Sequence, residues 1–228
     1  MMKNLVVLTG AGISAESGLK TFRDSNGLWE GHDVMEVATP EGFAKNPELV
    51  LEFYNQRRTQ LLTVQPNKGH LNLTKLESFF NVEIITQNVD NLHERAGSSN
   101  VLHLHGELLK VRSTVNESLV YNWNKDLVLG DVCKLESQLR PHIVWFGEAV
   151  PMLDTAIEIT QKADILVIIG TSMQVYPAAS LVHYIKENTP IYFIDPNPSV
   201  TENQFKNLCI IADKASNGTD KLLKKLTA

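Results

Sequence analysis

Short apolar runs alternate along the chain with longer segments in which apolar residues recur every three or four positions. Each run is too short for a helix, and most are rich in Val, Ile and Leu, which is typical of strands buried on both faces of a sheet. Strands that alternate with helices predict a doubly wound, Rossmann-like parallel α/β sheet. The predicted strands are Leu5 to Thr9, Val82 to Ile85, Val101 to Leu104, Ile143 to Phe146, Asp164 to Ile169, Ile191 to Ile194 and Leu208 to Ile211.

Helical periodicity fills the segments between these strands. Thr39 and Asn46 are good N-cap residues, and each precedes a Pro-Glu pair at which a helix should begin. On the second of these helices Tyr54 and Arg57 are neighbours by their spacing of three residues. Further helices are expected at about residues 67–80, 152–162, 177–187 and 220–226.

Two stretches interrupt the alternation and predict a second, smaller lobe formed by two insertions. Apolar residues of the second insertion (Val111, Val115, Leu119, Val120 and Trp123) suggest short antiparallel strands. We expect one domain over residues 1–228. Its Rossmann lobe should cover about 1–20, 66–107 and 143–228, and its small lobe about 21–65 and 108–142.

A glycine-rich turn follows the first predicted strand. Gly10, Gly12 and Ala15 satisfy the pattern G-x-G-x-x-G/A. Gly10 allows a tight turn, and Gly12 lets backbone N–H groups approach a pyrophosphate. The following helix, which carries Glu16, points its positive end at the anion. The pattern favours a dinucleotide site, and an ordinary tight strand–helix turn is the alternative.

Polar side chains also follow the next two predicted strands. Gln87, Asn88 and Asp90 come after one strand and His105 after the other. Because the carboxyl ends of parallel strands open onto one crevice, these side chains should meet there. The ordinary pKa of histidine suits His105 to proton transfer, and the alternative is a packed histidine beside His103.

Two later strand ends carry residues suited to a nucleotide. Gly170, Thr171 and Ser172 fit phosphate and ribose hydrogen bonds, and Asp195 and Asn197 stand at the next strand end. A carboxylate in such a place suits the hydroxyls of the adenosine ribose.

Composition and charge narrow the class of protein. Of 228 residues, 43% are hydrophobic and 21% charged, so an ordinary globular core is possible. The net charge of -5 argues against nucleic acid as a partner. Two separated cysteines predict no disulfide framework, and we see neither a secretion signal nor an apolar run long enough to span a bilayer. We expect a soluble cytoplasmic protein that binds no membrane, with a monomer as the default.

Six motifs in one order strongly resemble the sirtuins, the NAD-dependent protein lysine deacylases. The resemblance covers residues 4 to about 226 and implies NAD as cofactor. Within the family, Thr21-Phe22-Arg23 together with Phe53-Tyr54-x-x-Arg57-Arg58 look like the class III branch, which removes acidic acyl groups such as succinyl and malonyl. The motifs are Gly10-Ala11-Gly12-Ile13-Ser14, Thr21-Phe22-Arg23, Thr86-Gln87-Asn88-Val89-Asp90, His105-Gly106-Glu107, Val144-Trp145-Phe146-Gly147-Glu148 and Gly170-Thr171-Ser172.

The resemblance gives the candidate residues roles. His105 matches the family's base, which deprotonates a ribose hydroxyl, and Asn88 and Asp90 complete the catalytic set. The products implied are free lysine, nicotinamide and O-acyl-ADP-ribose. The cofactor-binding residues implied are Gly10, Ala11, Gly12, Ile13, Glu16, Phe22, Arg23, Gln87, Asn88, Val89, Asp90, Gly170, Thr171, Ser172, Asp195, Asn197 and Ala215. Asp195 and Asn197 depart from the family's usual Asn and Glu.

The substrate implied is an acylated lysine in a protein or peptide. The peptide should lie extended against residues 144–148, where Val144, Phe146, Gly147 and Glu148 are candidate contacts. Tyr54 and Arg57 would read the distal carboxylate of a succinyl or malonyl group, because a guanidinium fork matches a carboxylate. The alternative is that the pair only packs the small lobe.

The chain departs from the family at its structural zinc. Most sirtuins bind this zinc with four small-lobe cysteines, whereas this insertion carries only Cys133, and Ser113 stands where the first cysteine is expected. A four-cysteine site cannot form, so zinc is not expected. His142 and Asp131 could offer ligands, but their spacing fits no zinc pattern. We expect packing to hold the lobe instead, through Val115, Leu119, Val120, Trp123 and Leu135.

Three other functions compete with deacylation. An NAD hydrolase or ADP-ribosyltransferase would cleave the same nicotinamide bond but use a different acceptor. A dehydrogenase is disfavoured, because Asn88, Asp90 and His105 suit loss of nicotinamide better than hydride transfer. A catalytically weak NAD-binding sensor is the third alternative.

Overall fold

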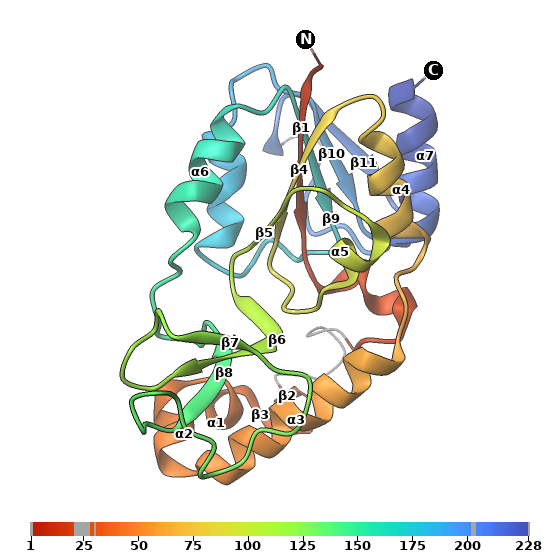
Figure 1. The fold of residues 1–228 in the computed structure, drawn as a ribbon. Coiled ribbons are helices and arrows are strands. Elements are labelled where there is room, and N and C mark those ends of the chain that lie inside the picture. The colour runs from red at the N-terminus through yellow and green to blue at the C-terminus, as the bar shows by residue number, and fades with distance from the viewer. Residues whose placement is uncertain (1, 21–27, 30, 202–203, 228) are drawn as a thin grey trace.

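The large lobe is built on a six-stranded sheet (Figure 1). The structure is a computed structural model that describes residues 2–20, 28–29, 31–201 and 204–227. All neighbouring strands are parallel, in the order β11-β10-β9-β1-β4-β5. Read from β5, this is the Rossmann order 3-2-1-4-5-6, so the predicted fold class is confirmed. The strands are β1 (Asn4–Thr9), β4 (Asn81–Thr86), β5 (Val101–His103), β9 (Ile165–Ile169), β10 (Ile191–Ile194) and β11 (Leu208–Ile211).

Alternating side chains of each central strand feed two separate cores. In β1, Leu5 and Val7 face one core while Val6 and Leu8 face the other. The first core is covered by α4 (Lys68–Leu76) and α7 (Ala215–Thr227). The second is covered by α6 (Leu153–Gln161) and the 3₁₀ helix Ala178–Tyr184. Figure 1 shows α6 on one side of the sheet and α4 with α7 on the other. Burial on both faces explains why these strands read as continuous apolar runs.

The small lobe lies at the carboxyl end of the sheet, below it in Figure 1. Its centre is a three-stranded antiparallel sheet in the order β7-β6-β8, with bounds Val120–Asn122, Gly106–Ser113 and Leu139–Ile143. The first insertion adds α1 (Val34–Val37), α2 (Pro40–Lys45) and α3 (Pro47–Thr63), together with the strand pair β2 (Leu28–Trp29) and β3 (His32–Asp33). A short helix, α5 (Leu92–Ala96), connects β4 to β5.

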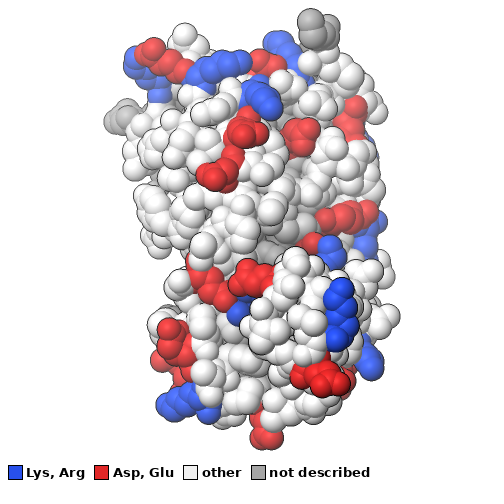
Figure 2. All heavy atoms as spheres, turned by 60° about the vertical axis from the view of Figure 1, so that its left-hand side comes forward, with Lys and Arg blue, Asp and Glu red and all other residues white. Residues whose placement is uncertain are grey.

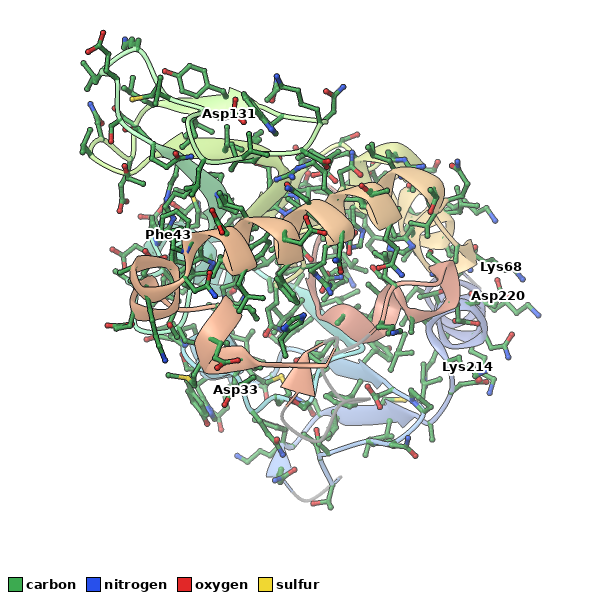
Figure 3. All side chains as sticks on the ribbon, turned by 90° about the horizontal axis from the view of Figure 1, so that it is seen from below. Asp33, Phe43, Lys68, Asp131, Lys214 and Asp220 are labelled. Atoms are coloured by element: carbon green, nitrogen blue, oxygen red, sulfur yellow. The ribbon has the colours of Figure 1, made fainter. Side chains whose placement is uncertain are left out.

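Helix starts follow the N-cap signals. The Thr39 hydroxyl accepts the Gly42 N–H at 3.0 Å, and the Asn46 side chain accepts the Leu49 N–H at 3.2 Å. The α2 and α3 starts are therefore confirmed. Asp33, labelled in Figure 3, caps α1 in the same way. Lys68 and Asp220, labelled together in Figure 3, pair α4 with α7.

The strand predicted at Ile143 to Phe146 is wrong. β8 covers Leu139–Ile143 and pairs antiparallel with β6, so it belongs to the small lobe. The apolar run from Ile143 to Phe146 resembled a strand because Trp145, which is only 2% exposed, packs into the small-lobe core beyond the end of β8. Helix limits also differ: residues 77–80 lie beyond α4, α7 begins at Ala215, and the segment 178–184 is a 3₁₀ helix.

The expected packing of the second insertion is wrong in part. Val115, Val120 and Leu135 are exposed, whereas Leu119 and Trp123 flank the local core. That core consists of Leu51, Val111, Leu127, Cys133 and Leu139. Leu51 comes from α3, so the first insertion supplies part of the core of the second. Among the described residues, no helix is both long and apolar enough to cross a membrane.

Candidate active site

A cavity of about 290 Å³ lies where the strand ends of the large sheet meet the small lobe. Strands β1, β4 and β9 open onto it from the large lobe, and α3 with the segment after β8 closes it from the small lobe. It brings together most of the residues chosen from the sequence. They are Gly10, Ala11, Gly12, Tyr54, Arg57, Gln87, Asn88, Val89, Asp90, His105, Val144, Phe146, Gly147, Glu148, Gly170, Thr171 and Ser172.

The glycine turn is pressed against the neighbouring strand end. The Gly10 N–H donates to the Ile169 carbonyl at 3.0 Å, and the Gly12 N–H donates to the Gly170 carbonyl at 2.8 Å. A Cβ on Gly12 would lie 2.6 Å from the Gly170 Cα, so no side chain fits there. Gly170 has φ of +63°, a left-handed conformation that favours glycine. The turn therefore offers a cradle of bare backbone at the switch point of the sheet, which suits a pyrophosphate.

Asn88 and Asp90 are held by Ser14. The Ser14 hydroxyl donates to Asp90 Oδ2 at 2.9 Å and accepts from Asn88 Nδ2 at 3.2 Å. Asn88 Nδ2 also lies 3.2 Å from the Gly10 carbonyl. Burial raises the pKa of Asp90, although the Leu92 N–H and the Ser14 hydroxyl, which donate to its carboxylate, oppose that shift. The network fixes the amide and the carboxyl at the floor of the cavity.

His105 has one nitrogen fixed within the protein. Its Nδ1 lies 3.0 Å from the Gln87 carbonyl, which can only accept, so Nδ1 carries the proton. Burial lowers the pKa of His105, with the Gln87 hydrogen bond opposing the shift. The ring is therefore neutral near pH 7, and Nε2 keeps a lone pair. A neutral imidazole with a fixed tautomer at a cavity wall can act as a general base.

His103 has the opposite character. Its two ring nitrogens face acceptors: the Asn88 carbonyl at 3.0 Å and Glu94 Oε1 at 2.7 Å. Burial disfavours its charged form, but the hydrogen bond and charge of Glu94 outweigh burial and raise the pKa of His103. The ring thus serves as a cation paired with Glu94. The sequence assigned no role to His103, and its two hydrogen bonds give it a structural one behind Asn88.

Two further histidines lie fully buried beneath the cluster. His70 and His93 meet edge to face, with ring centroids 4.9 Å apart. His70 Nε2 lies 3.5 Å from the Ser14 hydroxyl, and His93 Nε2 lies 3.1 Å from the Thr9 hydroxyl. Burial lowers the pKa of His70 to about 4 and that of His93 well below its usual range. Both rings are therefore neutral, and they support the Ser14 side of the site.

The small-lobe wall is formed by Tyr54, Arg57 and Trp145. The Trp145 indole N–H donates to the Tyr54 hydroxyl oxygen at 2.9 Å. An indole N–H cannot accept, so the phenol proton is directed away from it. Burial raises the pKa of Tyr54, and the phenol stays protonated. The Arg57 guanidinium lies 5.4 Å from the Phe53 ring centroid and lines the same cavity.

Glu148 is engaged inside the small lobe. Its carboxylate accepts from Arg140 at 2.6 Å and from Arg112 at 3.2 Å, and it accepts the Trp145 N–H at 2.8 Å. Burial opposes the charged form, but Arg140 and the Trp145 N–H hold the pKa of Glu148 below its usual range. The carboxylate therefore organises the loop after β8.

The remaining predicted cofactor residues lie away from the cavity or outside the described residues. Phe22 and Arg23 belong to the latter group. The Glu16 carboxylate accepts the Ser216 N–H at the start of α7. Asp195 is buried at the end of β10, where its Oδ1 accepts the Asn197 N–H at 2.9 Å. Ile13 and Ala215 have buried side chains in the core between α4, α7 and the sheet.

Sequence reasoning missed several residues of the cavity. Ser14 and Trp145 were noted only within their sequence motifs, yet both line the cavity. The helix predicted after the glycine turn is wrong, because the chain forms two short 3₁₀ turns there, Ala11–Ile13 and Ala15–Ser17, with Ser14 between them. Polarity within an otherwise apolar stretch was the available signal for Ser14. Tyr176 and Pro177 after β9, and Gln60 on α3, gave no local signal, since only the fold brings them to the cavity.

The surroundings of Cys133 in the small lobe do not fit a four-thiolate metal site. The Cys133 thiol donates to the Ser113 hydroxyl oxygen at 3.3 Å. That oxygen also accepts the N–H groups of Val115 and Asn116 at 3.2 and 3.3 Å. The other cysteine, Cys209, lies in β11 of the large lobe. In the part of the chain that the structure describes, no three His, Cys, Asp or Glu residues are grouped to hold a metal ion.

Comparison with known proteins gives consistent matches. Residues 10–177 match the Sir2 family. An NAD-dependent protein deacylase of Helicobacter pylori (strain ATCC 700392 / 26695) is 60% identical over 225 residues, covering 99% of this chain and 98% of the relative. A protein of the same name from Bacteroides thetaiotaomicron is 53% identical over 231 residues, covering 99% and 98%.

Solved structures agree with the sequence matches. A Sir2 homologue in complex with NAD superposes with a TM-score of 0.88 at 40% identity, covering 99% of this chain and 90% of the other. A Sir2 variant with a deacetylated p53 peptide and 3'-O-acetyl ADP-ribose superposes with a TM-score of 0.82 at 29% identity, covering 98% and 94%.

Proposed function

The chain belongs to the Sir2 family and is an NAD-dependent protein lysine deacylase, and from this premise we propose which residues carry out the reaction and which acyl groups the enzyme prefers. When bound, NAD would supply the ribose that takes the acyl group from lysine, with loss of nicotinamide and consumption of one water molecule. The products are free lysine, nicotinamide and O-acyl-ADP-ribose. The observation that carries the proposal is the meeting of the glycine cradle, the Asn88–Asp90 cluster and a neutral His105 in one cavity.

The cradle of Gly10, Gly12 and Gly170 fits the pyrophosphate of NAD. A side chain at any of these positions would collide with backbone, which supports a site built for close approach of a ligand. Thr171 lies beside it, where its hydroxyl accepts from Gln87 Nε2 at 3.1 Å. We assign the buried amide and carboxyl of Asn88 and Asp90 to nicotinamide. Asp195, Asn197 and Ala215 are proposed for the adenosine side.

His105 acts as the general base in this proposal. Because Nδ1–H donates to the Gln87 carbonyl, Nε2 is the atom that accepts the proton of a ribose hydroxyl. A lowered pKa keeps the ring neutral and able to accept at neutral pH. Nε2 can later return that proton when lysine leaves.

Tyr54 and Arg57 are proposed to read an acidic acyl group. Both line the cavity from α3, and the phenol remains a hydrogen-bond donor because its pKa is raised. A phenol and a guanidinium side by side present donors that match a carboxylate. Succinyl and malonyl groups are therefore the expected substrates beside acetyl.

The peptide is proposed to lie along residues 144–148. The N–H groups of Val144 and Phe146 donate to the His105 and Ala38 carbonyls, each at 2.9 Å. An extended peptide can then pair by donating its own N–H groups to carbonyl oxygens of this segment. Such pairing reads backbone and tolerates many sequences around the lysine. Phe146, which is 43% exposed, offers an apolar contact.

One experiment separates deacylation from its alternatives. The protein is incubated with NAD and an acetyl-, succinyl- or malonyl-lysine peptide, and nicotinamide and deacylated peptide are both quantified. We expect one nicotinamide for each peptide deacylated. Nicotinamide without deacylated peptide would instead indicate an NAD hydrolase, transfer of ADP-ribose to protein would indicate an ADP-ribosyltransferase, and neither product would indicate a sensor.

A further inference from the structure

We propose that Arg140 is a positioning residue for the acyl pocket, because it orients Trp145 and, through the indole N–H, the Tyr54 hydroxyl. The proposal rests on the proposed preference for acidic acyl groups and names the residue that sets the geometry of that pocket. Arg140 itself does not line the cavity, so it acts through Trp145.

Trp145 connects the pocket to the interior of the small lobe. Its indole N–H donates to the Tyr54 oxygen, and its ring lies against Phe43 with centroids 5.4 Å apart. The Arg140 guanidinium lies over the same ring, with Cζ 3.4 Å from the centroid. Phe43, labelled in Figure 3, comes from α2 of the first insertion. The ring is thus covered by a planar cation, and its N–H is directed at the hydroxyl of Tyr54, which lines the cavity.

The guanidinium of Arg140 is itself fixed. It donates to both oxygens of Glu148, at 2.6 and 3.1 Å, and to the Ile143 carbonyl at 3.0 Å. Only 8% of Arg140 is exposed. These bonds hold the guanidinium plane and therefore the ring that stacks on it, since stacking requires the two planes to lie together.

Arg112 offers a matched comparison within the same cluster. It lies directly opposite Arg140 in the β6–β8 register and donates to the same Glu148 carboxylate at 3.2 Å. It is also buried, at 4% exposure, but no described contact joins it to Trp145. The two arginines therefore share the ion pair, and Arg140 alone has the stacking contact and the bond to the Ile143 carbonyl.

The test uses Arg140→Lys and Arg112→Lys, because lysine keeps the positive charge beside Glu148 and lacks the planar group. For each protein, kcat/KM is measured with succinyl- and acetyl-lysine peptides of one sequence. We expect Arg140→Lys to lower the succinyl-to-acetyl ratio about fivefold to tenfold, the size of one misplaced hydrogen bond. Arg112→Lys should change the ratio by less than about twofold. A loss of general stability would lower both activities alike and leave the ratio unchanged.

A second readout follows the indole directly. The Trp145 indole N–H signal is assigned in a ¹⁵N spectrum by its absence in Trp145→Phe. Arg140→Lys should shift this signal and Arg112→Lys should leave it in place. Trp145→Phe keeps a ring for stacking but loses the N–H, so its succinyl-to-acetyl ratio should also fall.

The outcomes distinguish this proposal from the acyl preference on which it rests. If the wild-type protein shows no Arg57-dependent preference for succinyl-lysine, the acyl preference fails, and the indole signal alone decides whether Arg140 orients Trp145. If the preference is present but both lysine variants change the ratio equally, or neither does, the positioning role of Arg140 is overturned. An unshifted indole signal in Arg140→Lys overturns it as well.

Discussion

The two lobes bury different kinds of side chain at the cavity that they share. The large lobe supplies apolar strands whose polar residues come mainly at their ends, with Glu83 in the middle of β4 as an exception. The small lobe buries charge beneath its cavity wall: Arg58, Arg112 and Arg140 are each less than 9% exposed, and Glu148 joins two of them. In the large lobe, the residues that form the core therefore lie within the strands, and the residues that line the cavity lie at the strand ends. In the other, charged groups that lie behind the proposed acyl pocket also form ion pairs within the lobe.

Surface charge does not show this difference. Figure 2 shows blue and red atoms interspersed on the visible face, with no continuous cover of either sign. The contrast lies in the interior, where an ion pair is costly unless every partner is present. Mutations of the strand-end residues in the large lobe should consequently lower activity, whereas mutations of the buried ion pairs in the small lobe should lower stability.

The largest effect is expected from His105→Ala in the large lobe. Loss of the base should lower kcat about 10²–10⁴-fold, the usual range for a general base. The His105 ring is partly exposed, so the folded structure should remain. Deacylated peptide and the urea midpoint measure the two properties. If activity persists within about tenfold of wild type, another group is the base.

Glu148→Gln should show the converse pattern in the small lobe. Removing the carboxylate charge leaves two buried guanidinium groups without their anion, which should cost about 3–5 kcal/mol of unfolding free energy. Glu117→Gln is the control, because Glu117 is 72% exposed and lies 4.0 Å from Arg112. Urea unfolding measures both variants. Equal, small losses would show that the cluster does not hold the lobe.

Acidification should destabilise the large lobe through its buried neutral histidines. The pKa of His70 falls from 6.5 to about 4 on folding, so the unfolded chain binds the extra proton between these values. Stability is therefore complete above about pH 6.5 and is lost as pH falls toward 4, by roughly 3 kcal/mol for this one group.

The histidine effect is checked by measuring unfolding free energy against pH. His70→Gln should flatten the slope between pH 6.5 and 4, with His93 keeping part of it because burial lowers its pKa in the same direction. An unchanged slope in His70→Gln would show that protonation of His70 does not contribute to the acid sensitivity of folding.

A smaller effect is expected where the small lobe lacks the family's zinc ligands. Ser113→Ala removes the acceptor of three hydrogen bonds in the buried turn and should cost about 1–3 kcal/mol. Ser118→Ala, at an exposed position of the same insertion, should cost less than about 0.5 kcal/mol. Dialysis against a chelator should leave both melting temperatures unchanged. Stoichiometric, tightly bound zinc in the purified protein would contradict this picture.

The large lobe was predictable because its strands obey one rule. β10 and β11 have the bounds read from the sequence, since a buried parallel strand is an apolar run bounded by polar residues. Gln87, Asn88, Asp90 and His105 come together because parallel strand ends share an edge. Neither inference needed any long-range contact beyond the sheet itself.

The small lobe could not be predicted to the same depth. Its β8 strand contains Arg140 and His142, and its charged residues are buried through partners distant in sequence, so periodicity identifies neither the strand nor the core. Trp145 looked like a strand residue because it lies in an apolar run. Its contacts with Tyr54 and Arg140 depend on the fold and leave no local signal in the sequence. Ser113 gave no sign of the Cys133 contact, because the two are twenty residues apart in sequence.

The central claim is that the small lobe selects the acyl group that the large lobe's chemistry removes. The most direct test measures kcat/KM for succinyl- and acetyl-lysine peptides with wild-type protein and Arg57→Met. We predict a preference for succinyl-lysine in the wild type and, in the variant, a loss of about tenfold or more for succinyl-lysine with little change for acetyl-lysine, because only the charged acyl group loses a charge-assisted hydrogen bond. Equal activity on both peptides, with Arg57→Met altering neither, would contradict the account.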